Sequence, residues 1–195
     1  MSRWVVVLVA LLGGCFSPGG TREAQRYFVL EAIPATTAQT ASTRGAAILV
    51  AATGAASFYD TQGIVFSLSP GTRAYYQHSS WTERPSRRIH DLLTSRLRQS
   101  GAFRMVAVEG SGLRGNLVLA TYLEELYHDA ARPPGTVQIV LRAELADPAQ
   151  RALVARRSFS RSAPVVSYDA PGAVQAFNQA LGGLLDEIVT WVAAQ

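Results

Sequence analysis

The sequence predicts a single domain of the α/β (α+β) class, in which β-strands pack against two main helices. Two segments space their apolar residues as helices do, and a long stretch between them alternates apolar and polar residues as strands do. The chain has 195 residues, of which 48% are hydrophobic and 16% charged. This length and composition allow one sizeable core, and they argue against a disordered polyelectrolyte or a two-domain enzyme.

Short strands open the predicted domain, which we place at residues 26–195. Runs of aromatic and β-branched residues predict strands at 27–30, 47–52, 63–68 and 73–77, with Thr-Gly and Ser-Pro-Gly turn residues between them. Helical spacing follows from Pro85 through Ile89, Leu93 and Leu97, so we expect a helix over about 84–100. Gly101 stands where a left-handed residue ends such a helix.

The second half of the domain reads as a strand, a meander and a helix. Residues 103–108 predict a strand, 116–129 and 136–147 a long hairpin, and 151–163 its third strand. Asp169 and Pro171 then begin an amphipathic C-terminal helix that we expect to pack on the sheet. Gly182 and Gly183 inside it predict a close backbone approach to the sheet or to another subunit.

The amino terminus has the features of a lipoprotein signal. Arg3 precedes an apolar run over residues 4–12, which is too short for a bilayer core that needs roughly 20 helical residues. Residues 12–15 (LGGC) resemble the bacterial lipobox, in which the peptide is cut between Gly14 and Cys15 and the cysteine is acylated. Cys15 is the chain's single cysteine, so it cannot form an internal disulfide, and lipidation explains it.

We therefore expect a signal peptide at 1–14 and a lipidated, flexible tether at 15–25. Cys15 would carry a diacylglyceryl group and an N-acyl chain such as palmitate, and we expect no other cofactor. Several acyl chains on one residue anchor a protein essentially permanently. Phe16 follows the cysteine, and by resemblance to lipoproteins of double-membraned bacteria it indicates the outer membrane, facing the periplasm.

Charge and histidine patterns exclude several classes of function. All 18 basic residues are arginines, and they are scattered along the chain, so we expect no nucleic-acid partner. His78, His90 and His128 belong to no catalytic or metal-binding motif. We expect surface or loop histidines, no catalytic residue and no metal site.

The order of several segments resembles the ABC-type transport auxiliary lipoprotein family. The segments are 27–30 (YFVL), 58–66 (FYDTQGIVF), 75–76 (YY), 81–85 (WTERP), 101–103 (GAF), 123–126 (LEEL), 176–180 (AFNQA) and Trp191. The resemblance implies a mixed, folded sheet with two packing helices. It also implies a non-enzymatic accessory of an MCE/ABC-type transporter that moves phospholipid or other hydrophobic molecules between the inner and outer membranes.

The implied partners are an MCE-type lipid-binding protein with its ABC permease and ATPase, and the outer membrane through the lipid anchor. The sequence leaves open whether the protein forms a homo-oligomer. It also leaves open an alternative function, in which the protein is an envelope-assembly or cell-wall-regulating lipoprotein that binds a protein partner without handling lipid. Our candidate partner contacts are Tyr75, Tyr76, Trp81 and Arg84, because large aromatics beside an arginine are favoured at interfaces. Packing in the core is the competing interpretation of the aromatic residues.

Overall fold

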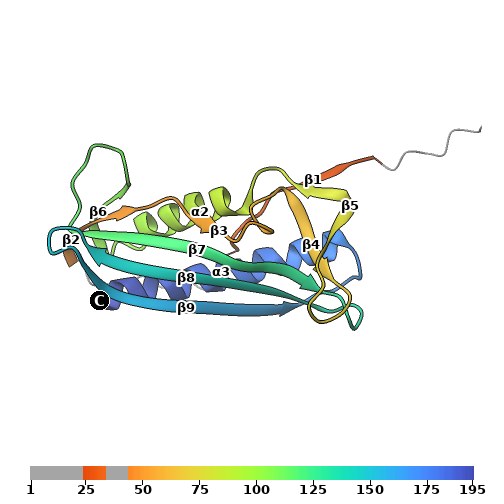
Figure 1. Cartoon of the computed structure of the whole chain (residues 1–195). Coiled ribbons are helices and arrows are strands. Elements are labelled where there is room, and N and C mark those ends of the chain that lie inside the picture. Colours follow the sequence, from red (N-terminus) through yellow and green to blue (C-terminus); the bar gives the residue numbers. More distant parts are fainter. Residues whose placement is uncertain (1–23, 34–43) are drawn as a thin grey trace, which may run out of the picture.

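A long central strand, β7 (Leu117–Asp129), organises the sheet of the computed structural model, which describes residues 24–33 and 44–195. Along one edge β7 pairs antiparallel with β8 (Thr136–Asp147), which pairs antiparallel with β9 (Ala152–Pro164). The predicted hairpin and meander are therefore confirmed, and Figure 1 shows these three strands as one curved layer.

The other edge of β7 is shared by three shorter strands in succession. They are β2 (Arg44–Val50), β3 (Gly54–Ala55) and β4 (Gly63–Ser67), all parallel to β7. Outside them lie β6 (Phe103–Val108), parallel to β2; β5 (Ala74–Trp81), antiparallel to β4; and β1 (Arg26–Phe28), parallel to β5. This mixed, folded sheet confirms the predicted fold class.

Two helices, α2 (Pro85–Gln99) and α3 (Ala170–Ala194), pack against the sheet and against each other. In Figure 1, α3 lies behind the layer formed by β7, β8 and β9, and α2 lies above β7, beside β2 and β6. α2 packs against β6 and β7, α3 packs against β8 and β9, and Arg96 of α2 pairs with Asp186 of α3. The apolar face of α3 supplies much of the core, where Phe177 meets Trp81 and Trp191 meets Phe159, both edge to face.

The ends of both helices agree with the sequence prediction. α2 begins at Pro85, and Gly101 beyond its last residue has φ 64°, the left-handed conformation expected of a glycine there. In α3 the carboxylate of Asp169 accepts a hydrogen bond from the backbone N–H of Gly172 at 2.8 Å, which satisfies one of the unpaired donors of the first turn.

The segment that follows β1 crosses between the two helices. Asn178 of α3 accepts a hydrogen bond from the backbone of Glu31 on its side-chain oxygen and one from Ile33 on its backbone oxygen. From α2, Arg88 donates to the carbonyl of Leu30. Gly182 faces the backbone of Ile33 so closely that a Cβ would overlap it. A close backbone approach is present at Gly182, but its neighbour is the segment after β1 and not the predicted sheet or second subunit, and Gly183 meets the side chain of Arg161 on β9.

The domain is elongated, and its ends differ in the loops they carry (Figure 1). One end holds the first described residues, the turn between β4 and β5, the tip of the β7–β8 hairpin and the loop from β9 to α3. The opposite end holds the 109–116 loop, the turn between β8 and β9, and the C-terminus. The chain therefore enters the described domain at one end and leaves it at the other.

Candidate functional site

The predicted lipidation site lies outside the described residues. Gly14, Cys15 and the signal peptide 1–14 all fall before residue 24, so lipidation and cleavage stay predictions. Within the ranges that the structure describes, no helix is both long enough and apolar enough to cross a membrane.

Trp81, one of the four expected partner contacts, is a core residue. Its side chain is 1% exposed, and its ring packs edge to face against Phe177 with centroids 5.7 Å apart. Trp81 is the last residue of β5 and meets Phe177 of α3, so its side chain lies on the face of the sheet that the helix covers. Trp81 was expected to contact a partner, but it packs in the core instead.

Tyr75 lies on the surface and is stacked on a second aromatic residue. The rings of Phe58 and Tyr75 are 4.8 Å apart and nearly parallel, at 10°, with exposures of 39% and 41%. The Tyr75 hydroxyl donates to the backbone carbonyl of Phe58 at 3.0 Å. Gly63 lies against the Tyr75 ring, where a Cβ would overlap it, so this exposed pair is held in one position.

Tyr76, the next residue of the strand, is half-buried and points away from that pair, because neighbouring strand residues face opposite sides. Its hydroxyl lies 2.7 Å from Nδ1 of His128, which is fully buried, and Nε2 of His128 lies 2.7 Å from the carbonyl oxygen of Pro134. A carbonyl can only accept, so Nε2 carries the proton and Nδ1 accepts from Tyr76. The expectation of a surface or loop histidine is wrong for His128.

Burial shifts the pKa values of both partners. Desolvation lowers the pKa of His128 and raises the pKa of Tyr76 to about 12, to which the nearby Tyr168 and Asp169 also contribute. Both groups are therefore neutral at physiological pH, as their mutual hydrogen bond requires. The Tyr76–His128 pair joins β5 to β7 and serves packing rather than surface contact.

Arg84 is exposed at the start of α2 and borders a surface hollow of about 580 Å³. Its guanidinium donates to Asp60 at 3.2 Å, and the Ser86 hydroxyl donates to the other oxygen of that carboxylate at 3.1 Å. The hollow is lined by Ala52, Thr53, Asp60, Gln62, Glu83, Arg84, Ser86, Arg87 and His90. Acidic and basic side chains both line the hollow, so it is polar but neither strongly positive nor strongly negative.

The hydrogen bonds in this hollow hold the backbone in place. His90 donates from Nδ1 to the carbonyl of Ala51 at 3.0 Å, which ties α2 to the end of β2. Ser86 is engaged with Asp60, a contact that fastens the loop after β3 to the same helix. In residues 24–33 and 44–195, no group of three or more His, Cys, Asp or Glu side chains could hold a metal ion.

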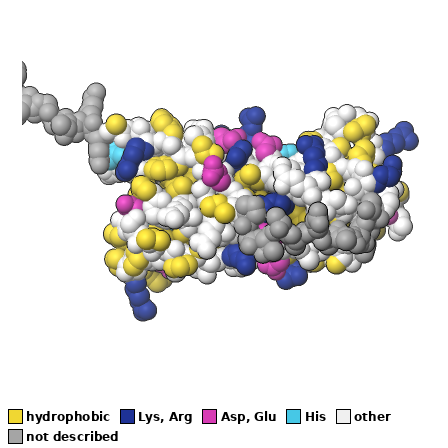
Figure 2. Space-filling model, turned by 180° about the vertical axis from the view of Figure 1, so that it is seen from behind, with side chains coloured by type: hydrophobic (Ala, Val, Ile, Leu, Met, Phe, Trp, Pro, Cys, Tyr) yellow, Lys and Arg dark blue, Asp and Glu magenta, His cyan; other side chains and the backbone are white. Residues whose placement is uncertain are grey.

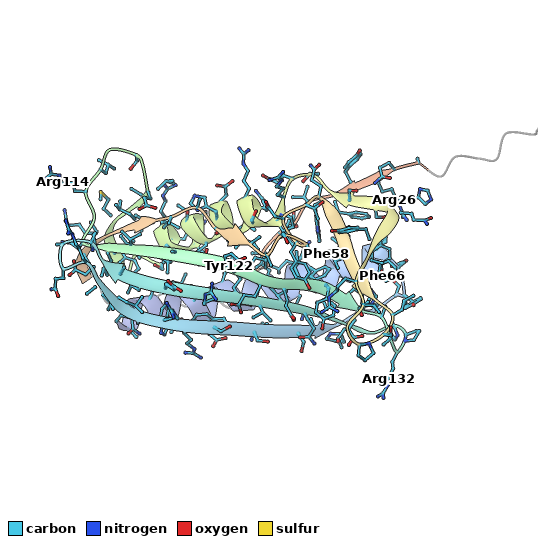
Figure 3. All side chains as sticks on the ribbon, viewed as in Figure 1. Arg26, Phe58, Phe66, Arg114, Tyr122 and Arg132 are labelled. Carbon is cyan, nitrogen blue, oxygen red and sulfur yellow. The ribbon has the colours of Figure 1, made fainter. Side chains whose placement is uncertain are left out.

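Sequence analysis missed two residues of this surface, Phe58 and Asp60. Both lie in the segment 58–66 that carries the family resemblance, but their loop has no periodic pattern to indicate where its side chains point. The loop brings Phe58 onto Tyr75 and Asp60 onto Arg84 (Figure 3 labels Phe58). We call these four residues the aromatic–arginine face.

The sequence match agrees with this architecture. A family model described as the ABC-type transport auxiliary lipoprotein component matches residues 28–189, from the end of β1 to within the last turns of α3. The chain belongs to this family. It is thus an auxiliary lipoprotein component of transport, and the resemblance found in the sequence is confirmed. No curated protein matches the chain in sequence.

Solved structures with low sequence identity share the family fold. The crystal structure of protein XCC0632 from Xanthomonas campestris has a TM-score of 0.77 and 24% identity, over 87% of this chain and 95% of that one. A second crystal structure, of an uncharacterized protein, has a TM-score of 0.68 and 14% identity, over 87% of this chain and 99% of that one. At these identities the likeness shows the fold alone.

Proposed function

We propose that this protein is an outer-membrane-anchored periplasmic lipoprotein and a non-enzymatic accessory of an MCE/ABC-type transporter that moves phospholipid or other hydrophobic molecules between the two membranes. The observation that carries the proposal is the family match over residues 28–189. The predicted lipidation of Cys15 and the Phe16 that follows it support the outer-membrane anchor. In this assignment the ATPase and the permease are separate subunits.

We assign contact with a transporter subunit to the aromatic–arginine face. Its aromatic pair is exposed and already ordered by stacking and by the bond from Tyr75 to Phe58, so binding would cost little side-chain entropy. Arg84, which is bound to Asp60 of the loop that carries Phe58, has a side chain that is 62% exposed. Tyrosine and arginine are both enriched among the residues that dominate binding energy at interfaces.

The test is site-specific photocrosslinking in the native envelope. A photoreactive phenylalanine analogue replaces Tyr75 in one strain and Val154 in a second, a position on β9 of comparable exposure, 45%. We expect position 75 to crosslink the MCE-type protein or the permease, and position 154 to give much less of that product. Mass spectrometry of the product identifies the partner.

Two results would contradict the proposal. Crosslinks from position 75 to cell-wall synthases or envelope-assembly proteins alone would favour the alternative function. Equal crosslinking from both positions would remove the interface from the aromatic–arginine face. As a second measurement, Arg84→Glu should reduce co-purification with the transporter several-fold while the thermal melt stays close to wild type, since Arg84 contributes an exposed ion pair of small energy.

Cys15→Ala tests the anchor itself. The variant lacks the chain's only thiol, so metabolic labelling with a fatty-acid analogue should be abolished, and the protein should leave the membrane fraction. Gly20→Ala, in the predicted tether, is the matched control and should be labelled normally. Label on the Cys15→Ala protein would overturn the lipoprotein assignment of this chain.

A further inference from the structure

We propose that the end of the domain carrying β1 binds the phospholipid surface directly, as a second contact beside the acyl anchor. The surface comprises the turn after β4 with Leu68, the tip of the β7–β8 hairpin with Arg132, and the loop after β9 with Val166 and Tyr168. We call it the anchor-side end. The inference rests on the proposed function for the anchor at Cys15.

Exposed apolar side chains gather on this surface. Val166 is 78% exposed, Leu68 57% and Tyr168 51%, and the hairpin tip adds Ala131, Pro133 and Pro134, all exposed. Figure 2 shows hydrophobic side chains over this end of the molecule, on the left in that view. Removing apolar side chains from water is favourable in proportion to the apolar area that is buried. A surface of this kind in a domain with a complete core indicates an interaction.

The three loops form one rigid surface. The backbone N–H of Ala130 donates to the carbonyl of Ser67 at 2.8 Å, and that of Val165 donates to the carbonyl of Gly135 at 3.0 Å. The ring of Tyr168 packs edge to face against His128, which holds the hairpin tip through Pro134. Because the loops are tied together, the side chains reach the bilayer without a further ordering cost.

An exposed arginine at this end can bind lipid headgroups. Arg132 is exposed at the hairpin tip (Figure 3), and a guanidinium matches the phosphate group of a phospholipid. Two carboxylates lie in the same loops, Asp129, which accepts from the N–H of Ala131, and Asp169, which accepts from that of Gly172. These hydrogen bonds do not remove their charge, so the lipid contact rests on the apolar side chains together with Arg132. Tyrosine and aliphatic side chains beside an arginine are the composition found at membrane–water interfaces.

The acyl anchor is attached at this same end of the domain, which indicates that the surface contacts the bilayer. Ala24, the first described residue, follows Cys15 by nine positions, which span about 30 Å at most when extended. The opposite end lies farther away by the length of β9, a strand of 13 residues or roughly 40 Å. The anchor therefore holds Leu68, Val166 and Tyr168 near the membrane at a high effective concentration.

Fluorescence quenching by lipid tests the contact on the mature, acylated protein in vesicles of phosphatidylethanolamine and phosphatidylglycerol. The thiol of Cys15 is consumed by lipidation, so Val166→Cys introduces a single reactive thiol for an environment-sensitive dye. Leu113→Cys is the matched control, 54% exposed in the 109–116 loop at the other end. We expect an interfacial lipid quencher to reduce the emission at position 166 several-fold more than at position 113.

Other outcomes overturn the inference and separate it from the proposed function. Equal quenching at the two positions would show that this end has no preferred contact with lipid, and quenching at 166 only when an MCE-type protein is added would exclude direct lipid contact. Protein that fails to float with the vesicles refutes the anchor and with it the proposed function. Flotation with no quenching at 166 refutes only the present inference.

A charge variant gives a second readout. Tyr168→Asp combined with Leu68→Asp should abolish most of the quenching at position 166, whereas Leu153→Asp with Leu113→Asp, at the far end, should preserve it. Leu68→Asp and the far-end variant change only exposed side chains, so their melting temperatures should stay close to that of the parent protein. Tyr168→Asp also removes the ring that packs on His128 and should lower the melting temperature, so Leu68→Asp alone, which keeps that contact, should still reduce the quenching. Unchanged quenching in the Tyr168→Asp, Leu68→Asp protein would contradict the proposal.

Discussion

At the scale of single residues, His128 shows how one buried polar group joins three parts of the chain. Its two ring nitrogens bind Tyr76 of β5 and Pro134 of the hairpin tip, and Tyr168 before α3 packs on its ring. Such a group stabilises the fold only while both nitrogens keep their partners. The same contacts hold the loops of the anchor-side end in place.

The lowered pKa of His128 predicts a stability that depends on pH. The folded state favours the neutral imidazole, so this contribution is fully present above the ordinary pKa of about 6.5 and is lost as pH falls through the lower folded value. Between about pH 8 and pH 5 the wild-type Tm should fall more than that of His128→Gln, which has no titrating group at this position. Thermal melts at several pH values measure how Tm changes with pH in wild type and in His128→Gln. The same pH dependence in both proteins would contradict the prediction.

At the scale of elements, α3 depends on its first turn. Asp169→Ala removes the side-chain acceptor for the Gly172 N–H and should cost about 1 kcal/mol in the free energy of unfolding. Asp169→Asn keeps an acceptor oxygen and should retain most of that stability. Urea denaturation compares the variants. An alanine variant as stable as wild type would show that the cap contributes nothing.

Neighbouring glycines in α3 should respond differently to the same substitution. A Cβ at Gly182 would overlap the backbone of Ile33, whereas a Cβ at Gly183 would meet the guanidinium of Arg161, which can move. Gly182→Ala should therefore cost about 1–3 kcal/mol. Gly183→Ala should be close to neutral, because helix propensity favours alanine by about 1 kcal/mol. Urea denaturation measures the free energy of unfolding of both variants. An equal change in the two variants would contradict the packing argument.

At the scale of the whole molecule, the described core is formed by residues that follow the tether. In the part of the chain that the structure describes, the sheet and both helices lie within residues 26–194, and the buried hydrophobic residues begin at Leu30. A protein beginning at Gln25 should therefore be folded and should unfold cooperatively on heating. Circular dichroism in the far and near ultraviolet monitors this transition. A product without cooperative melting would mean that the tether, the lipid or a partner subunit completes the fold.

Local patterns predicted most of the elements and the order in which they occur. The strand predicted at 73–77 extends to Trp81 in β5, because its last residues pair with β1 and β4, partners far away in sequence. The two-residue β3 gave no pattern at all, since it exists only through its pairing with Tyr122 and Leu123 of β7. Pairing between distant segments leaves no periodic signal in either one.

The sequence by itself determined the helices, the meander and the expectation of a lipid anchor at Cys15, because each depends on neighbouring residues. The order of segments along the chain determined the family. The tertiary structure alone decided which side chains are available to partners. Trp81 lies in the core, Tyr76 is half-buried against His128 and Tyr75 lies on the surface, although all three lie on one strand. It also brought Leu68, Arg132, Val166 and Tyr168, from three separate loops, to one end. Exposure and long-range proximity arise from packing in three dimensions, which local sequence patterns do not encode.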